Sequence, residues 1–552
     1  MTTVPLTARV PASPAAKRCA LVASILGSGV VFLDGTIVNV ALPAIRSSLH
    51  GDLASQQWVV EAYLLTLGSL LLIGGSLGDL YGRRRVFSIG LVGFGICSLL
   101  CAVAPSSEFL IFARGLQGVA GALLVPSTLA LIVDTFPQEE RAAAIGTWTA
   151  WTGVATVIGP LGGGALVQAA SWRWIFVINI VPVAITLLLL QRLPADHRTP
   201  GHVDVIGGIL CALGLGGPVF ALIEQPTYGW GDPRVLIPLV GGLALLVAFV
   251  VWERYDRQPM LPLALFRIRN FSIGNLVTLL LYSGLGVATF FLILFIQQVG
   301  GYTPIEAGVS LLPITIIMFL FSRRFGALAD RIGPHLFMTV GPIVAGCGLL
   351  LISRTSADAN YLTEIFPGVV VFGLGLSATV APLTATVLSS VEEGHSGLAS
   401  GVNNAVSRVA GLLAIAALGA VVASAFQARL DRDIDPGQLS SQGQAVVQQA
   451  RTRPLVVTVQ GGSPSDRAKI HPALVDASVH AFRIGMEVGA GLAVIGGLIA
   501  LVGIENPRRR VRCADCQPPA VSATGANLNG QETIDVTAPP ATGPAPALSG
   551  RG

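Results

Sequence analysis

Charged residues are scarce in this chain of 552 residues: they make up 12% of it, against 52% hydrophobic residues. Soluble domains average about 25% charged residues. So few charges cannot cover a water-facing surface, which excludes a soluble protein. The net charge is only +4, which gives no reason to expect a nucleic-acid partner. Lysine is almost absent, with only Lys17 and Lys469, so the basic residues are nearly all arginine. This bias favours a bacterial source.

Several kinds of chemistry lack their residues. Cys513 and Cys516 form one CxxC in a polar tail without a second pair, so no zinc site is expected. The other cysteines lie in apolar segments, where cysteine behaves as a small hydrophobe. The chain has no GxxxxGK[S/T] loop, which disfavours an ATP-driven pump. It also lacks the array of His, Asp and Glu that a membrane-embedded enzyme needs. We therefore predict no enzyme activity, no metal and no cofactor.

Long apolar segments fill most of the chain. A helix needs about 20 apolar residues to cross about 30 Å of hydrocarbon, and we count about fourteen such segments. No signal-peptide cleavage pattern precedes the first one. The sequence thus predicts an all-α integral membrane protein. The spans are expected at about 18–44, 55–78, 86–104, 107–135, 141–169, 173–192, 203–225, 234–252, 271–298, 304–321, 336–354, 361–389, 396–426 and 480–505.

Arginines gather in alternate short loops, after spans 2, 6, 8, 10 and 14. Cytoplasmic loops of membrane proteins carry such an excess. We therefore expect both termini in the cytoplasm and the chain in a bacterial plasma membrane, as a multi-pass protein and a monomer. The polar, Gln-rich loop at about 427–479 is then extracellular. The tail 506–552, rich in Pro, Ala, Thr and Gly, is expected to be disordered.

A short motif occurs twice. Residues 75–85 read GSLGDLYGRRR and residues 326–333 read GALADRIG, so both share G-x-L-x-D-x-x-G. The copies follow the second and tenth spans, and two related six-helix halves would place them six spans apart. Two spans must therefore be inserted between the halves. The expected parts are a tail 1–17, a half 18–192, an insert 193–270, a half 271–505 and the tail 506–552.

The repeated motif predicts a gating latch. Gly75 and Gly82 allow close helix approach and a sharp turn. Asp79 can accept hydrogen bonds from helix N-terminal amides or pair with an arginine of its loop, for which Arg83 and Arg84 are candidates. A latch that forms in one conformation can be released in another. The alternative is an ordinary arginine-rich loop beside an interfacial aspartate. The second copy, with Asp330, lacks the three arginines, so we expect a weaker latch there.

These residues carry a family resemblance. The repeated loop is similar to motif A of the major facilitator superfamily. Residues 33–43 (LDGTIVNVALP) resemble the first-helix motif of its fourteen-span drug:proton antiporter family. Residues 114–118 (RGLQG) match motif B, 159–164 (GPLGGG) match the antiporter motif C, and 172–179 (WRWIFVIN) resemble the start of span 6. One departure is Ala155, where motif C usually has glycine. The resemblance implies two pseudo-symmetric halves and proton-coupled export.

Motif C also has a mechanical interpretation. Gly159 and Pro160 interrupt the backbone hydrogen bonds within the membrane and permit a kink. Gly163 and Gly164 let a neighbouring helix approach span 5 closely. The alternative is the general abundance of Gly and Pro in membrane helices.

Some charged residues lie deep within the predicted spans, where a charge costs about 2.5–3.5 kcal/mol and is functional by default. At about 1.5 Å per residue, Asp34, Glu61 and Arg114 all fall in the outer half of the first six-helix group, so we expect a cluster. Burial opposes the charged carboxylate and the arginine favours it. This competition suits a proton carrier. Asp34 is the first choice and Glu61 the second; a static ion pair is the alternative.

Further residues are candidates for a substrate cavity. Arg408 is expected near the midplane of span 13 and could attract polar or anionic cargo. Aromatic side chains could stack on a substrate, although they more often pack or form interfacial belts. The full set is Asn39, Trp58, Tyr63, Gln117, Asn403 and Arg408.

The sequence therefore predicts a secondary exporter of hydrophobic or cationic drugs or antibiotics, driven by proton entry and working by alternating access. Its partners would be drug-like molecules, protons and the lipid bilayer. Export of one metabolite or a self-made antibiotic is the first alternative. A transport-inactive membrane sensor is the second.

Overall fold

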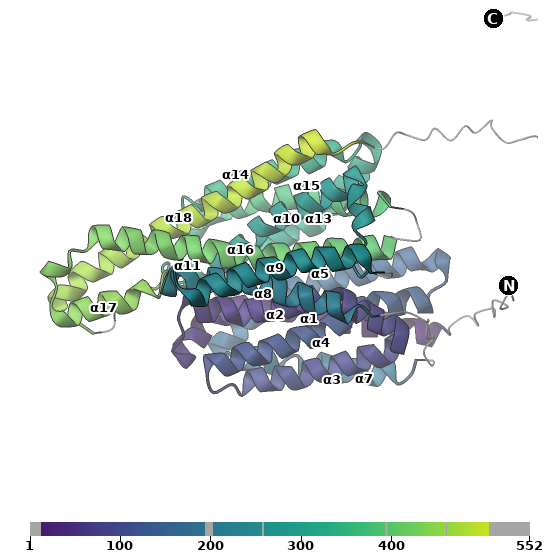
Figure 1. Cartoon of the computed structure of the whole chain (residues 1–552), viewed down its shortest axis with the longest axis horizontal. Coiled ribbons are helices and arrows are strands. Elements are labelled where there is room, and N and C mark those ends of the chain that lie inside the picture. The colour runs from purple at the N-terminus through teal and green to yellow at the C-terminus, as the bar shows by residue number, and fades with distance from the viewer. Residues whose placement is uncertain (1–12, 194–202, 257–258, 392–395, 460, 507–552) are drawn as a thin grey trace, which may run out of the picture. The chain divides into compact units, whose positions relative to one another are not determined.

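A computed structural model describes residues 13–193, 203–256, 259–391, 396–459 and 461–506. Residues up to Asn506 form one compact unit, and Pro507–Gly552 is a separate unit outside the described residues. The predicted disordered tail and the Cys513–Cys516 pair therefore lie outside them too. Within the described ranges the chain is helical and no strand occurs (Figure 1). The predicted all-α class is confirmed.

Thirteen helical stretches are long and apolar enough to cross a membrane in the described part of the chain. Some are made of consecutive helices, with π-helical turns η2 (Ala288–Leu292) and η3 (Tyr361–Ile365) inside two of them. The helices are α1 (Pro14–Leu49), α2 (Leu53–Tyr81), α3 (Arg83–Ala102), α4 (Ser107–Thr135), α5 (Gln138–Ala169), α8 (Val205–Tyr228), α9 (Pro233–Tyr255), α10 (Arg269–Val287) with α11 (Ile293–Gln298), α12 (Pro304–Ser310) with α13 (Leu312–Ile332), α14 (His335–Ile352), α15 (Phe366–Ser389), α16 (Ser396–Asp433) and α18 (Pro464–Gly503).

The predicted sixth span, 173–192, is broken. It consists of α6 (Trp174–Val177) and α7 (Ile180–Leu190), and only together do they form an apolar stretch of moderate length. The described chain thus has thirteen long apolar stretches and this shorter one, which is close to the predicted fourteen. The backbone at Ile178 and Asn179 between them keeps right-handed helical dihedrals, and Asn179 lies beside α1 and α3.

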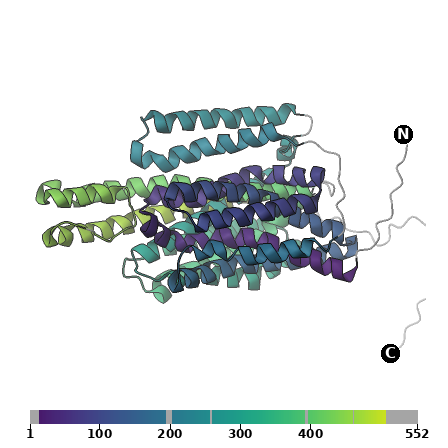
Figure 2. The ribbon, with the colours of Figure 1, turned by 90° about the horizontal axis from the view of Figure 1, so that it is seen from below.

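Two groups of helices form the bundle. In the first, α2 packs on α4 and α1 packs on α5 and α7; in the second, α14 packs on α15 and α18, and α10 packs on α16. The helices α8 and α9 pack on each other, and α8 contacts both α2 and α16. Figure 2 shows this pair as a separate layer on one side of the bundle. The inserted pair thus contacts one helix from each group.

Both copies of the repeated motif lie at one end of the bundle, here called the loop end. There α2 ends at Gly82 with φ 101° and α13 ends at Gly333 with φ 98°. Backbone with such positive φ is available to glycine and costly for other residues. The last glycine of the motif therefore has the same purpose in both copies, which is to turn the chain sharply between two antiparallel helices.

The opposite end, the cap end, carries a helical cap formed by residues 427–479. The prediction of a loop over these residues is wrong, because α16 and α18 both extend into this region. These helices have 38 and 40 residues, which makes each about 57–60 Å long, whereas the hydrocarbon layer is about 30 Å thick. A further helix, α17 (Ser441–Arg451), lies between them. Ion pairs join the cap, Arg429 to Asp476 at 2.6 Å and Arg451 to Asp431 at 2.5 Å. Its polar composition reflects helices surrounded by water.

Gly82→Ala is expected to lower the free energy of unfolding by about 1–3 kcal/mol, because alanine must adopt the same positive φ. Gly333→Ala should do the same. A matched control is Gly241→Ala in α9, where an added methyl group meets no atom within 4 Å. Denaturation of the purified variants measures the difference. Equal stability of all three variants would contradict this role of the motif glycines.

Candidate functional site: a buried polar network around Asp34

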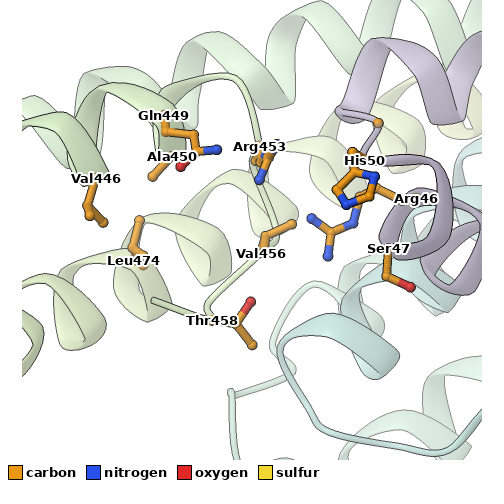
Figure 3. A pocket seen from close by; sticks show the side chains of 11 residues that line it. Arg46, Ser47, His50, Val446, Gln449, Ala450, Arg453, Val456, Thr458 and Leu474 are labelled. Carbon is orange, nitrogen blue, oxygen red and sulfur yellow. The ribbon is translucent and has the colours of Figure 1, made fainter. Parts of the chain in front are cut away.

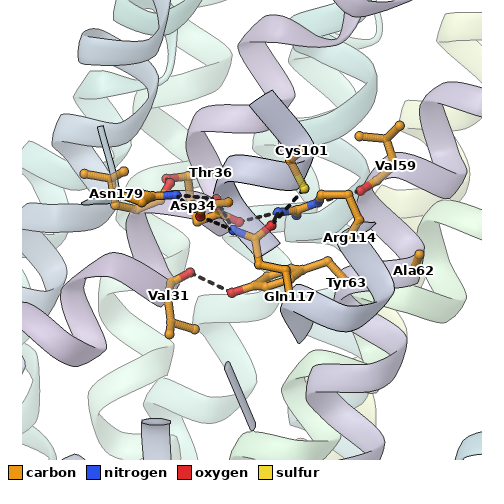
Figure 4. A network of polar contacts seen from close by, with 12 residues as sticks. Val31, Asp34, Thr36, Val59, Ala62, Tyr63, Cys101, Arg114, Gln117 and Asn179 are labelled. Atoms are coloured by element: carbon orange, nitrogen blue, oxygen red, sulfur yellow. Dashed lines mark hydrogen bonds and ion pairs between the residues drawn. The ribbon is translucent and has the colours of Figure 1, made fainter. Parts of the chain in front are cut away.

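Asp34 in α1 and Arg114 in α4 form an ion pair between Arg114 Nη1 and Asp34 Oδ2 (Figure 4). Both side chains are fully buried, at 0% and 1% exposure. The sequence predicted that these two residues would meet. Breaking a buried pair by removing one partner is costly, because the remaining charge has no compensation.

Amide groups complete the surroundings of the Asp34 carboxylate. Its Oδ1 accepts hydrogen bonds from Gln117 Nε2 at 3.1 Å and from Asn179 Nδ2 at 2.9 Å. The hydroxyl of Ser98 in α3 accepts from the same two amides, at 2.9 and 3.2 Å. The network therefore joins α1, α3, α4 and the break between α6 and α7. Asn179 stands in the recognised span-6 motif but was not predicted as a site residue. Nothing in the sequence marked Ser98.

Arg114 has further partners besides Asp34. Its Nε donates to the Val59 carbonyl at 2.9 Å and its Nη1 to Gln117 Oε1 at 2.7 Å. The Tyr63 ring centroid lies 4.1 Å from the guanidinium carbon, close enough for a cation–π contact. The Tyr63 hydroxyl donates to the Val31 carbonyl at 3.0 Å, which fixes the ring. Arg114 therefore keeps neutral partners that do not depend on the charge of Asp34.

Glu61 does not join this cluster, contrary to expectation. It is fully buried, but neither carboxylate oxygen has a hydrogen-bond partner. On a helix of 3.6 residues per turn, a side chain two positions from Tyr63 leaves α2 on nearly the opposite side. The depth estimate placed Glu61 at the correct height but could not give its direction. The polar network has one carboxylate, not two.

The six candidate cavity residues separate into three groups. Tyr63 and Gln117 belong to the polar network. Trp58 and Asn403 contact neighbouring helices: Trp58 Nε1 donates to Glu224 of α8 at 3.1 Å, and Asn403 Nδ2 donates to Thr278 of α10 at 2.8 Å.

Asn39 and Arg408 form the third group. The Asn39 amide oxygen is buried without a partner. The guanidinium of Arg408 in α16 lies 5.0 Å from the ring centroid of Phe32 in α1. Arg408 therefore contacts the first helix across the boundary between the two groups of helices.

The motif C glycines of α5 pack on two helices, first on α1 and further along on α12. A methyl group on Gly159 would lie 2.3 Å from Thr36 Oγ1, and one on Gly163 would lie 2.4 Å from Ile37 Cγ1, so α1 packs closely there. Pro160 cannot donate to the carbonyl four residues earlier, that of Thr156. Thr36 Oγ1 lies 3.3 Å from this carbonyl oxygen and donates to it, shared with carbonyls of its own helix. The first helix thus replaces part of the hydrogen bond that Pro160 removes.

The same stretch of α5 also contacts the second group of helices. A methyl group on Gly164 would lie 2.6 Å from Ile305 Cα of α12, and one on Gly308 would lie 2.3 Å from the Pro160 carbonyl oxygen. Towards the same end, Gln57 Nε2 donates to the Ile415 carbonyl at 2.8 Å and Gln297 Nε2 to the Val40 carbonyl at 3.2 Å. The two groups of helices are therefore held together at the cap end.

At the loop end, Asp79 pairs with Arg83 at 2.9 Å, and Arg83 also pairs with Asp134 of α4 at 2.8 Å. Pro334 stands at the position of Arg83 in the second copy, so Asp330 has no such partner in its loop. The two predicted latches therefore differ in the charged groups that lie beside the motif aspartate. The side chain of Arg84 donates instead to the Leu193 carbonyl at 2.5 Å. Gly75 contacts Pro126 of α4.

Comparison with known proteins places this fold and site in a family. The model of the Major Facilitator Superfamily matches residues 24–415. The chain belongs to this superfamily. It is 34% identical over 493 residues to the puromycin resistance protein of Streptomyces alboniger, covering 88% of this chain and 90% of that one. It is 36% identical over 411 residues to the tetracenomycin C resistance and export protein of Streptomyces glaucescens, covering 73% and 76%.

Solved structures agree on the fold of this superfamily member. A bacterial homologue of the lysosomal transporter Spinster, in an inward-facing conformation, matches with a TM-score of 0.59 and 16% identity over 90% of this chain and 100% of that one. A D-xylose–proton symporter matches with a TM-score of 0.57 and 12% identity over 89% of this chain and 98% of that one.

The described residues hold no group of three His, Cys, Asp or Glu that could bind a metal.

Arg114→Met is expected to destabilise the protein by about 3–5 kcal/mol, because it leaves the Asp34 carboxylate buried without its charge partner. Adding Asp34→Asn removes that charge and should recover part of the loss. The free energies of unfolding of the two single variants and the double variant form a mutant cycle. Additive effects would contradict a direct ion pair.

Proposed function

We propose that this protein is a proton-coupled antiporter that exports hydrophobic, drug-like molecules or antibiotics across a bacterial plasma membrane by alternating access. The observation that carries the proposal is the buried Asp34–Arg114 pair within a bundle of this superfamily. An intramembrane ionisable pair is suited to moving protons. The relatives named for resistance to puromycin and tetracenomycin C, and for multidrug resistance in Mycobacterium tuberculosis, support drugs as cargo.

Protonation of Asp34 would remove the charge that Arg114 balances. Arg114 can then rely on the Val59 carbonyl, the Gln117 amide oxygen and the Tyr63 ring. Electrostatic attraction would no longer hold Asp34 beside α4, and the amides of Gln117 and Asn179 would lose a charged acceptor. The pair thus has two arrangements that differ by one proton. This is the property that an antiporter needs in order to exchange a proton for cargo.

A path from this pair to the gate runs through two close helix contacts. Asp34 shares α1 with Thr36 and Ile37, which pack on Gly159 and Gly163 of α5. Gly164 of α5 in turn packs on α12 of the other group. A shift of α1 after protonation would therefore disturb the contact that closes the cap end. The latch around Asp79 would act at the loop end.

The proposal includes an orientation and an energy source. The loop end and both termini would face the cytoplasm, because the arginine-rich short loops lie there, and the helical cap would face outside. The proton gradient would supply the energy without any cofactor. The protein would act as a monomer.

A second candidate function is export of a single compound, such as one antibiotic made by the host. The relatives from Streptomyces favour it, since the names of two of them refer to one antibiotic each. The chemistry of the proton site would be the same in both cases. Only the breadth of the substrate set would differ.

Proteoliposomes with an imposed pH gradient test the proposal. We expect gradient-driven transport of several dyes or antibiotics from a panel that includes puromycin and tetracenomycin C. Asp34→Asn should lower this transport at least about tenfold, equivalent to about 1.4 kcal/mol, because the residue can no longer exchange a proton. Glu61→Gln is the matched control, a buried carboxyl outside the network. One hit in the panel would favour the single-compound exporter. Undiminished transport against a gradient by Asp34→Asn would contradict the mechanism.

Gly164→Ala is expected to open the cap end, because the new methyl group collides with the backbone of Ile305 in α12. Gly153→Ala is the matched control on the same helix, where no atom lies within 4 Å of the added methyl. Labelling of Ala307→Cys, in a background without other cysteines, measures the opening through its reaction with a membrane-impermeant maleimide. Faster labelling is expected only with Gly164→Ala. Equal labelling rates would show that this contact does not close the cap end.

A further inference from the structure

A pocket lies at the cap end, where the end of α1 meets the helical cap (Figure 3). Its volume is about 200 Å³. One wall comes from α1 and the turn after it, and the other from α17, the following segment and α18. The lining residues are Arg46, Ser47, His50, Gly51, Val446, Gln449, Ala450, Arg453, Val456, Thr458 and Leu474.

The two arginines of this pocket, Arg46 and Arg453, carry charge of the same sign. Arg46, His50 and Arg453 come together on one side of it, as Figure 3 shows, and the lining contains no acidic residue. Neither arginine pairs with a carboxylate among the described residues. The Nε of Arg46 is buried without any hydrogen-bond partner. Like charges at short range repel, so the pocket has an uncompensated positive charge.

Two other arginines of the cap have carboxylate partners, although Arg451 Nε, like Arg46 Nε, is buried without a hydrogen-bond partner. Arg429 pairs with Asp433 and Asp476, and Arg451 pairs with Asp431. Arg453 follows only two residues after Arg451 but points towards Arg46 instead of a carboxylate (Figure 3). The cap therefore contains carboxylates that pair with arginines, but none of them lines the pocket.

The backbone on both sides holds these groups in place. His50 ends α1 with φ 57°, and its N–H donates to the Arg46 carbonyl. Leu455, between the lining residues Arg453 and Val456, has φ 67°. These two are the non-glycine residues with positive φ in the described chain. Such strained conformations persist where the surrounding structure requires them, and they gather at functional sites.

We propose that this pocket binds a phosphate group, either as a free ion or as part of a lipid headgroup. Guanidinium groups match the oxygens of phosphate, and charge-assisted hydrogen bonds of this kind are strong. Ser47, Gln449 and Thr458 supply further polar side chains on the walls. Pockets for drug-sized ligands measure about 300–1,000 Å³, so this one suits a small ion or a headgroup and excludes the proposed cargo.

The bound anion would join the two groups of helices. Arg46 belongs to α1 in the first group, and Arg453 belongs to the cap between α16 and α18 in the second. An anion between them replaces repulsion with attraction across that boundary. It therefore stabilises the conformation in which the cap end is closed. This site is separate from the proton site, and its binding test does not depend on transport.

Binding of inorganic phosphate to the full-length protein in nanodiscs of neutral lipid tests the proposal. We expect phosphate to raise the unfolding temperature and to show saturable binding by calorimetry, while chloride at equal ionic strength does neither. Arg46→Gln and Arg453→Gln should each raise the Kd for phosphate at least about tenfold, because each removes one of the two guanidinium groups. Arg467→Gln is the matched control, an exposed arginine of the same cap, and should leave the Kd unchanged.

A second arm separates a free ion from a lipid headgroup. Nanodiscs that contain phosphatidylglycerol replace those of neutral lipid, and co-purified lipid is counted by mass spectrometry. Retention of this lipid by the wild type and its loss from Arg46→Gln and Arg453→Gln would also support the site, with a headgroup as ligand. Absence of both phosphate binding and lipid retention in the wild type would overturn it, even if a variant fails to fold. Equal binding by the wild type and both variants would overturn it too.

Discussion

The interaction on which the rest of the structure depends is the buried ion pair of Asp34 and Arg114. A lone charge at this depth in a bilayer is costly, so each residue requires the other for as long as both are charged. Four helical segments supply the amide, hydroxyl, carbonyl and aromatic groups around the pair. Arg114 has neutral partners besides Asp34, which are a carbonyl, an amide oxygen and an aromatic ring. Asp34 also has neutral partners, because its Oδ1 accepts hydrogen bonds from the amides of Gln117 and Asn179.

Close helix contacts carry any movement of Asp34 to the ends of the bundle. The first helix can pack on α5 only because Gly159 and Gly163 have no side chains, and α5 can reach α12 only because of Gly164 and Gly308. Glycine at these positions lets backbones approach without a lipid-excluding side chain between them. The Asp34–Arg114 pair and the contact between α5 and α12 are therefore connected through α1 and α5. This explains why a motif far from any charge can matter for transport.

The sequence predicted those features that depend on residue type and spacing. The lengths of the apolar segments predicted the helices, and the repeated glycine–aspartate motif predicted a sharp turn in two equivalent loops. The estimated depths of Asp34 and Arg114 predicted that these two residues pair. Direction around a helix was harder: Glu61 has the right height but faces away from the pair, and Trp58 faces the inserted helix α8. Spacing along one helix cannot show which neighbour a side chain meets.

Other features needed the fold itself. Asn179 reaches Asp34 from its position between α6 and α7, and nothing in the spacing of that apolar segment showed which neighbour its side chain would meet. The cap was expected as a loop, because polar composition is typical both of loops and of helices surrounded by water. The pairing of Arg46 with Arg453 in one pocket joins residues about 400 positions apart, and neither has a pattern that points to the other.

The central claim is that Asp34 exchanges the proton that drives export. Proton release on substrate binding tests this most directly, with purified protein in weakly buffered detergent and a pH-sensitive dye. We expect a transported compound to release protons from the wild type, and Asp34→Asn to bind the compound without releasing any. The same proton release from Asp34→Asn would contradict it.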